Sequence, residues 1–164
     1  MRFFSFLILI SLIALPTCAE NISMTDLVGQ WHGVSKSVSG RHWFDFYDNG
    51  YIIEHSKFYL DIENKKPRIG VDVSIYRPIG TTAKTVDILV LRDVMNNPHA
   101  YVYSIHKGGK APWLGPDEIG IKIYTCTITP TAFLSANQYS IQTLKNNDMC
   151  NFSSSDYATY SRKK

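Results

Sequence analysis

Five histidines are the residues of this sequence best suited to bind a metal or to carry a proton. They are His32, His42, His55, His99 and His106. No two of them are two or four positions apart, the spacings that place two ligands on one face of a strand or helix. A zinc site would need at least three ligands brought together by the fold. The pattern favours exposed or hydrogen-bonded histidines, and we predict no metal site.

Motifs for covalent or acid–base catalysis are missing from the sequence. It contains neither a Gly-x-Ser-x-Gly elbow nor His-Glu-x-x-His. Carboxylates occur singly within strand-like runs, and no pair of them can be assigned as acid and base without geometry; they are Asp45, Asp72, Asp87 and Asp93. We therefore predict a protein that is not an enzyme and that uses no cofactor.

Two of the three cysteines, Cys126 and Cys150, predict a disulfide bond. The bond would close a loop of about 25 residues and stabilise the fold by roughly 3 kcal/mol. The alternative, a metal or catalytic thiol, is disfavoured because neither cysteine belongs to a Cys-x-x-Cys pair. A disulfide requires an oxidising compartment, so the first residues of the chain become important.

The first nineteen residues have the layout of a secretory signal peptide. Met1-Arg2 is followed by an apolar run over 3–15, a proline, and small residues at Thr17 and Ala19. Cleavage after Ala19 would leave a single domain over 20–164, with about 145 residues and a net charge of about +2. We expect an exported protein, periplasmic or secreted, with no integral membrane segment once the signal is removed.

Cys18 offers a second interpretation of this N-terminus. Leu15-Pro16-Thr17-Cys18 loosely resembles a bacterial lipobox, which would make Cys18 a lipidated anchor. The chain as a whole has 17 basic and 14 acidic residues, a balance that indicates no nucleic-acid partner. The oligomeric state is open at this stage.

After residue 20, short runs rich in Val, Ile, Tyr, Phe and Thr alternate with turn residues, which is typical of β-strands. A short helix over 23–27, capped by Ser23 or Thr25, is expected before the first strand. Asp48-Asn49-Gly50 predicts a hairpin turn, because Asn-Gly tolerates positive φ. The predicted strands cover 28–37, 41–47, 51–60, 68–76, 86–94, 100–107, 119–129, 133–144 and 158–162.

Eight to ten closely spaced strands in one domain predict an all-β fold. An antiparallel up-and-down barrel accommodates such strands without leaving sheet edges exposed. A β-sandwich is the alternative, since it uses the same short strands and close turns.

Three features resemble the lipocalins and related calycin barrels. Gly29-Gln30-Trp31 is similar to the Gly-x-Trp motif that opens these barrels, and Phe44-Asp45-Phe46 before Asp48-Asn49-Gly50 resembles the second strand and turn of small bacterial lipocalin-like domains. Arg162 falls where the family often places an arginine that packs on the tryptophan. The resemblance implies that Trp31 and Arg162 form a structural plug at one end of the barrel.

The lead functional hypothesis is a lipocalin-like carrier that binds a small apolar or amphipathic ligand. A barrel of about eight strands can enclose one such ligand, or it can be filled by its own side chains. The predicted lining consists of inward apolar residues, namely Phe44, Phe46, Val73, Ile88, Val90, Tyr103 and Ile123.

The segment 107–118 motivates the alternative hypothesis of a protein-binding module, such as a secreted hydrolase inhibitor. Twelve residues are long for a connection between strands, and long connections are often functional. Trp113 and Leu114 lie between Pro112 and Gly115-Pro116, which stiffen the loop. A large apolar pair held in this way suits a lid or an anchor for a protein partner. Trp113 could instead fold back and plug a barrel end.

Overall fold

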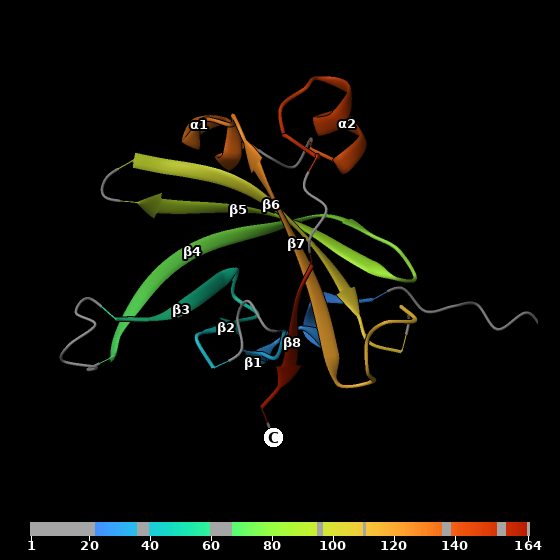
Figure 1. The fold of residues 1–164 in the computed structure, drawn as a ribbon. Helices are drawn as coiled ribbons and strands as arrows, with labels where there is room; N and C mark the ends of the chain where they lie inside the picture. Colours follow the sequence, from blue (N-terminus) through green and yellow to red (C-terminus); the bar gives the residue numbers. More distant parts are fainter. Residues whose placement is uncertain are drawn as a thin grey trace, which may run out of the picture.

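The computed structural model describes residues 22–35, 40–59, 67–94, 97–109, 111–135, 139–153 and 157–163. The predicted signal peptide and Cys18 lie outside these residues. The described chain forms a closed barrel of eight antiparallel strands that follow one another around the barrel in sequence order (Figure 1). The expected all-β, up-and-down barrel is confirmed.

Each strand pairs with its neighbours in the sequence, and β8 pairs with both β7 and β1, which closes the barrel. The strands are β1 (Gly29–Gly33), β2 (His42–Phe46), β3 (Tyr51–Tyr59), β4 (Pro67–Thr81), β5 (Thr85–Val94), β6 (Asn97–Lys107), β7 (Glu118–Cys126) and β8 (Ala158–Arg162). Alternate side chains of each strand point inward. The inward residues form the main core, which includes Trp31, Phe44, Phe46, Ile52, Tyr76, Ile88, Val90, Tyr103, Ile105, Ile119, Ile121 and Tyr160.

The local signals at the start of the chain are confirmed. The first helix is a single 3₁₀ turn, η1 (Met24–Asp26), in which the Ser23 side chain accepts a hydrogen bond from the Thr25 N–H. The Asp26 carboxylate accepts from the Ser23 N–H at 3.0 Å, which completes a capping box. The predicted 48–50 turn joins β2 to β3, and Gly50 has a φ of 87° that favours glycine.

The predicted strand over 133–144 is wrong, because two short helices occupy this region. They are α1 (Pro130–Leu134) and α2 (Ile141–Asn146), whose first turns are capped by the side chains of Thr129 and Ser140. Phe133 and Leu144 are fully buried in a second core on the outer face of the barrel, with Ile79, Leu89, Ala100, Val102 and Ile128. Helical packing on the sheet therefore overrode a weak strand preference.

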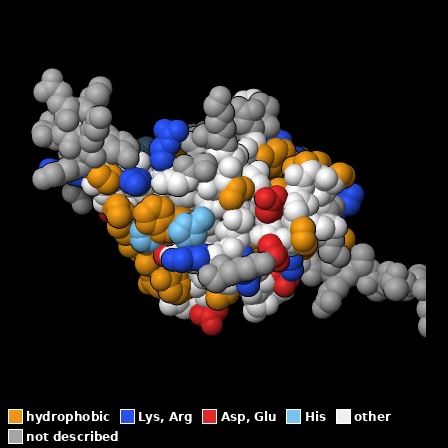
Figure 2. Space-filling model, turned by 60° about the horizontal axis from the view of Figure 1, so that its bottom comes forward, with side chains coloured by type: hydrophobic (Ala, Val, Ile, Leu, Met, Phe, Trp, Pro, Cys, Tyr) orange, Lys and Arg blue, Asp and Glu red, His pale blue; other side chains and the backbone are white. Residues whose placement is uncertain are grey.

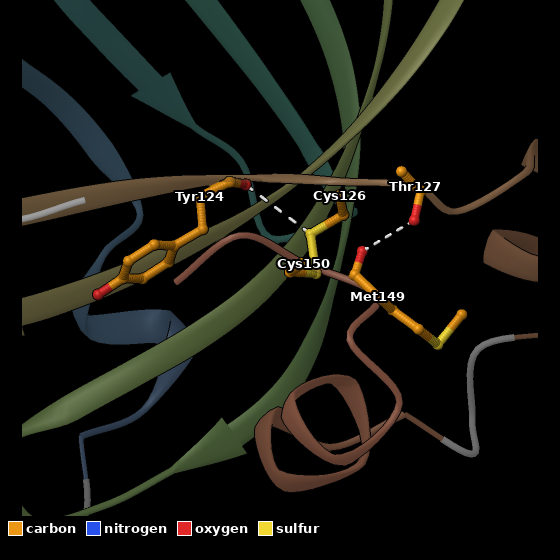
Figure 3. The surroundings of a disulfide bond; sticks show 5 residues. All are labelled: Tyr124, Cys126, Thr127, Met149 and Cys150. Carbon is orange, nitrogen blue, oxygen red and sulfur yellow. Dashed lines mark hydrogen bonds between the residues drawn. A yellow bond between two sulfur atoms is a disulfide. The ribbon is translucent and has the colours of Figure 1, made fainter. Parts of the chain in front are cut away.

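The predicted disulfide joins the end of β7 to the segment after α2 (Figure 3). The sulfur atoms of Cys126 and Cys150 are 2.05 Å apart. Beside the bond, the Thr127 N–H donates to the Met149 carbonyl at 2.8 Å. The covalent bond thus holds the helical segment against the barrel wall. Among the described residues, the helices are too short or too polar to span a lipid bilayer.

Candidate functional site

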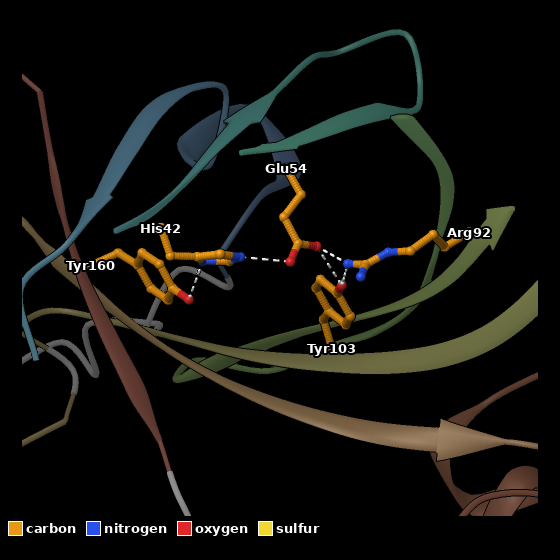
Figure 4. Close-up of polar contacts among 5 residues, drawn as sticks. All are labelled: His42, Glu54, Arg92, Tyr103 and Tyr160. Atoms are coloured by element: carbon orange, nitrogen blue, oxygen red, sulfur yellow. Dashed lines mark hydrogen bonds and ion pairs between the residues drawn. The ribbon is translucent and has the colours of Figure 1, made fainter. Parts of the chain in front are cut away.

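A network of five polar side chains from five strands lies inside the barrel (Figure 4). It comprises His42 of β2, Glu54 of β3, Arg92 of β5, Tyr103 of β6 and Tyr160 of β8. These residues lie toward the barrel end at which β2, β4, β6 and β8 begin, which we call the mouth. The opposite end, which carries η1, Trp31 and the 107–118 loop, we call the closed end.

Glu54 is the centre of the network. Its Oε1 atom lies 2.6 Å from His42 Nε2, and its Oε2 atom forms an ion pair with Arg92 Nη2. The Tyr103 hydroxyl donates to Glu54 Oε2 at 3.3 Å and accepts from Arg92 Nη2 at 2.9 Å. On the other side, Tyr160 Oη lies 2.9 Å from His42 Nδ1. The chain of contacts therefore crosses the whole barrel.

The direction of these hydrogen bonds follows from the charge state of His42. Burial and the Arg92 guanidinium lower the pKa of His42 to about 4, so the imidazole is neutral at pH 7. A neutral ring that donates from Nε2 to Glu54 must accept at Nδ1, and the Tyr160 hydroxyl supplies that proton. Burial raises the pKa of Tyr160 and of Tyr103, which keeps both hydroxyls protonated.

Gly33 allows this network to form. Strand β1 lies between β8 and β2. Gly33 lies opposite Tyr160 on the β8 side, and β2 begins at His42 on the other side. Because Gly33 has no side chain, nothing projects from β1 between His42 and Tyr160. The two rings can therefore meet across the strand that separates them, and their centroids are 5.8 Å apart.

Two buried polar atoms at the mouth have no hydrogen-bond partner among the described residues. They are Ser74 Oγ and Arg92 Nε, whose residues face each other across the β4–β5 pair. Burying an ion pair costs several kcal/mol per ion in desolvation, and apolar residues of similar size often stabilise a fold at least as well. A charged cluster with unused hydrogen-bonding groups is thus a candidate for ligand recognition rather than a device for stability.

Most of the predicted lining residues belong to a packed core. Phe44, Phe46, Ile88, Val90 and Tyr103 are all essentially inaccessible and pack against one another and their neighbours. The Phe44 ring, for example, makes close ring contacts with Phe46, Tyr103 and Tyr160. The centre of the barrel is therefore filled by its own side chains at these positions.

The other two predicted lining residues have different surroundings. Ile123 shares the inward face of β7 with Ile121 but is 36% exposed, because β8 pairs with β7 only as far as Ile121. The prediction that Val73 lines the barrel is wrong, because Val73 lies on the outer face of β4 and is 55% exposed. Asp72 and Ser74 point inward at its two sides, and strand alternation therefore turns Val73 outward.

The closed end carries the arrangement implied by the lipocalin resemblance. The Arg162 guanidinium lies over the Trp31 ring, 4.7 Å from its centroid, and also donates to the Asp26 carbonyl. Trp31 Nε1 donates to the Leu27 carbonyl at 2.7 Å. Lys107 Nζ lies 3.0 Å from the Asp26 carboxylate. The backbone N–H of Ser23 and the Lys107 ammonium lower the pKa of Asp26, which stays ionised.

The 107–118 loop presents Trp113 on the outside of the barrel. Leu114 is buried beside Gly120, whereas Trp113 is 57% exposed. The Trp113 ring rests on His106 and Tyr157, with centroid distances of 6.0 and 5.6 Å. Trp113 therefore neither closes the mouth nor fills the barrel. It is an exposed ring on a loop that Leu114 anchors.

No protein-family model matches this sequence, and no curated protein or solved structure matches it. Within the described residues, no three side chains of the metal-binding types come together. The functional interpretation therefore rests on the barrel and the chemistry of its mouth.

Most residues of the mouth network were not predicted from the sequence. The sequence predicts that His42 is exposed or hydrogen-bonded, and it assigns no role to Glu54, Arg92 or Tyr160. A usable signal was present in strand alternation: Arg92 has the same parity as Ile88 and Val90, which were predicted to face inward. A charged residue at an inward position marks a candidate site even before the fold is known.

Proposed function

We propose that this protein is an exported, lipocalin-like, non-catalytic binding protein that holds a small amphipathic ligand at the mouth of its barrel. The observation that carries the proposal is the buried Arg92–Glu54–His42 network, beside which Arg92 Nε and Ser74 Oγ have no hydrogen-bond partner among the described residues. Export is supported by the signal-like first nineteen residues and by the Cys126–Cys150 disulfide.

The chemistry of the mouth favours a ligand with an acidic group. Arg92 contacts Glu54 and Tyr103 through Nη2, and its Nε has no hydrogen-bond partner among the described residues, so the guanidinium retains donor capacity suited to a carboxylate, sulfonate or phosphate. Ile123 and Tyr101 supply apolar surface on the inward faces of β7 and β6, and the Arg92 guanidinium lies 5.5 Å from the Tyr101 ring centroid. Because Phe44 and Val90 fill the barrel below, the ligand lies shallowly.

The test uses anilinonaphthalene sulfonate, an anionic aromatic amphiphile whose fluorescence rises on binding. We expect saturable binding that is weakened at least tenfold by Ile123→Asp, which puts a negative charge on the partly exposed mouth wall. Leu134→Asp is the matched control, because Leu134 is exposed on α1, on the outer face of the barrel. Equal affinity in the wild type and both variants would contradict the proposal.

Intact mass under native and denaturing conditions gives the natural ligand of the exported protein. A small-molecule adduct found only in the native spectrum supports the carrier and supplies the ligand's mass. The denatured spectrum also distinguishes a chain that starts at Glu20 from one lipidated at Cys18, and it shows whether Cys126 and Cys150 are oxidised.

Trp113 supports a second candidate function, binding of a protein partner such as a hydrolase. An exposed tryptophan that rests on two other rings in an anchored loop needs little ordering on association, which is typical of interface hot spots. Trp113→Ala would then abolish partner binding and leave binding of the sulfonate probe unchanged. Partner binding that survives Trp113→Ala would exclude this use of the loop.

A further inference from the structure

Strand β4 extends beyond its neighbour β5 at the mouth. The β4–β5 pairing ends at Ser74 and Arg92, whereas β4 continues back to Pro67 with β3 as its only described partner. Figure 1 shows the β3–β4 and β5–β6 hairpins diverging from this point. Among the described residues, the segment 67–73 of β4 is therefore an open strand edge.

The direction of the free backbone groups on this edge follows from one hydrogen bond. The Tyr76 N–H donates to the Gly50 carbonyl, on the β3 side of β4. Because backbone groups alternate in direction along a strand, even-numbered residues of this segment bond to β3. The N–H and C=O groups of Ile69, Val71 and Val73 consequently point to the open side. An unpaired row of this kind is a template for another strand.

The side chains of the same three residues form an exposed apolar row on the outer face. Their exposed fractions are 58% for Ile69 and 55% for both Val71 and Val73. A groove of about 500 Å³ begins at Val73 and is lined by Tyr51, Val73, Ser74, Ile75, Leu91, Asp93, Pro98 and Pro130. Figure 2 shows hydrophobic side chains gathered beside histidines on one flank of the molecule.

The apolar row continues into an aromatic ladder on the neighbouring strands. The rings of His32, Trp43 and His55 stack in turn, with centroid distances of 5.8 and 4.8 Å. His55 lies opposite Val71 in the β3–β4 pair. The outer surface is thus a continuous half-apolar sheet that stops at the open edge of β4.

We propose that this edge pairs with the same edge of a second copy of the chain, antiparallel and with Gly70 on the two-fold axis. In this register Ile69 lies opposite Val71 of the second copy, and both are residues whose free backbone groups face the edge. Arg68 then lies opposite Asp72 of the second copy on the inward face. Among the described residues neither Arg68 nor Asp72 forms an ion pair.

The proposed register is complementary in charge as well as in backbone hydrogen bonding. The two-fold axis makes each contact twice, so two Arg68–Asp72 pairs and two Ile69–Val71 pairs form at once. Pairing stops at two copies, because the open edge of each copy is then paired with that of the other. The partner that this edge fits is therefore another copy of the chain.

Charge exchange tests the register. We expect the wild type to sediment as a dimer at micromolar to sub-millimolar concentrations. Arg68→Asp and Asp72→Arg should each weaken the dimer at least tenfold, because each places like charges opposite one another twice. The double variant restores the opposite charges and should restore the dimer. Lys57→Asp, the same charge change on the outer face of β3, is the control and should dimerise normally.

Val71→Pro tests the backbone pairing without a change in charge. The Val71 N–H points away from β3, so a proline there removes no hydrogen bond from the β3–β4 pair of the monomer. We expect a folded monomer, with a near-ultraviolet circular dichroism spectrum like that of the wild type. A monomeric wild type at every concentration, or a dimer that survives both Val71→Pro and the single charge reversals, would overturn the proposal.

Discussion

The two ends of the barrel bury polar groups in opposite ways. At the closed end, the Trp31 N–H bonds to a backbone carbonyl and the Arg162 guanidinium lies over the indole face at the edge of the molecule. At the mouth, Glu54 and Arg92 form an ion pair inside the barrel, and Ser74 Oγ and Arg92 Nε have no hydrogen-bond partner in the part of the chain that the structure describes. The contacts at the closed end are those of a structural plug, whereas the buried charges at the mouth are the basis of the binding site that we propose.

The difference also concerns accessibility. The apolar residues nearest the closed end, such as Phe46 and Ile119, are buried completely. Toward the mouth, β7 extends beyond β8 and leaves Ile123 partly exposed, and β4 extends beyond β5 and leaves an open edge. Unequal strand lengths thus leave one end of a closed barrel accessible.

Loss of the plug tryptophan should have the largest effect on stability. Trp31→Ala removes a buried indole and should lower the free energy of unfolding by about 4 kcal/mol. Arg162→Met, which keeps the apolar stem but loses the contact with the ring, should cost about 1 kcal/mol. Urea unfolding of both variants measures the two values. A Trp31→Ala cost no larger than that of Arg162→Met would show that Trp31 is not a main element of the core.

The mouth should respond differently, because a second substitution can rescue the first. Glu54→Leu leaves Arg92 without its ion-pair partner in a largely buried position and should lower the unfolding free energy by about 3 kcal/mol. Glu54→Leu combined with Arg92→Met should recover most of the loss, since neither charge is then buried. Urea unfolding of the single and double variants measures this coupling, and purely additive losses would contradict it.

The smallest predicted effect is on the pH dependence of the unfolding free energy. The pKa of His42 is about 4 in the folded protein and near 6.5 in the unfolded chain, so the unfolded chain binds more protons between these values. This residue therefore makes the unfolding free energy rise from pH 4 to pH 6.5 and contributes no slope above that range. His42→Gln keeps a donor and an acceptor but cannot titrate.

Comparison of the wild type with His42→Gln isolates this contribution. Asp26, with its lowered pKa, and Asp87, whose pKa is raised by burial, titrate in both proteins and cancel in the difference. Urea unfolding at pH 7 and pH 5 measures how much unfolding free energy each protein loses when the pH is lowered. We expect the variant to lose less than the wild type. Equal losses would mean that His42 does not control this slope.

Local features were predictable from the sequence because neighbouring residues determine them. Asp48-Asn49-Gly50 forms its turn, the Ser23 capping box forms, and the alternation of most strands is correct. The helices α1 and α2 show the limit of such prediction. Their caps, Thr129 and Ser140, were visible in the sequence, but five or six residues become stable helices only when Phe133 and Leu144 pack on the barrel.

The sequence by itself determined that the chain is an all-β domain with a Cys126–Cys150 disulfide, since strand periodicity, turn residues and cysteine spacing are properties of the chain. Only the tertiary structure decided which side chains meet inside the barrel and how far each strand extends beyond its neighbours. Strand closure brings together Glu54, Arg92 and His42, which are widely separated in the sequence, and unequal strand lengths expose Ile123 and the edge of β4. Both follow from the register between strands, which no single segment of the sequence encodes.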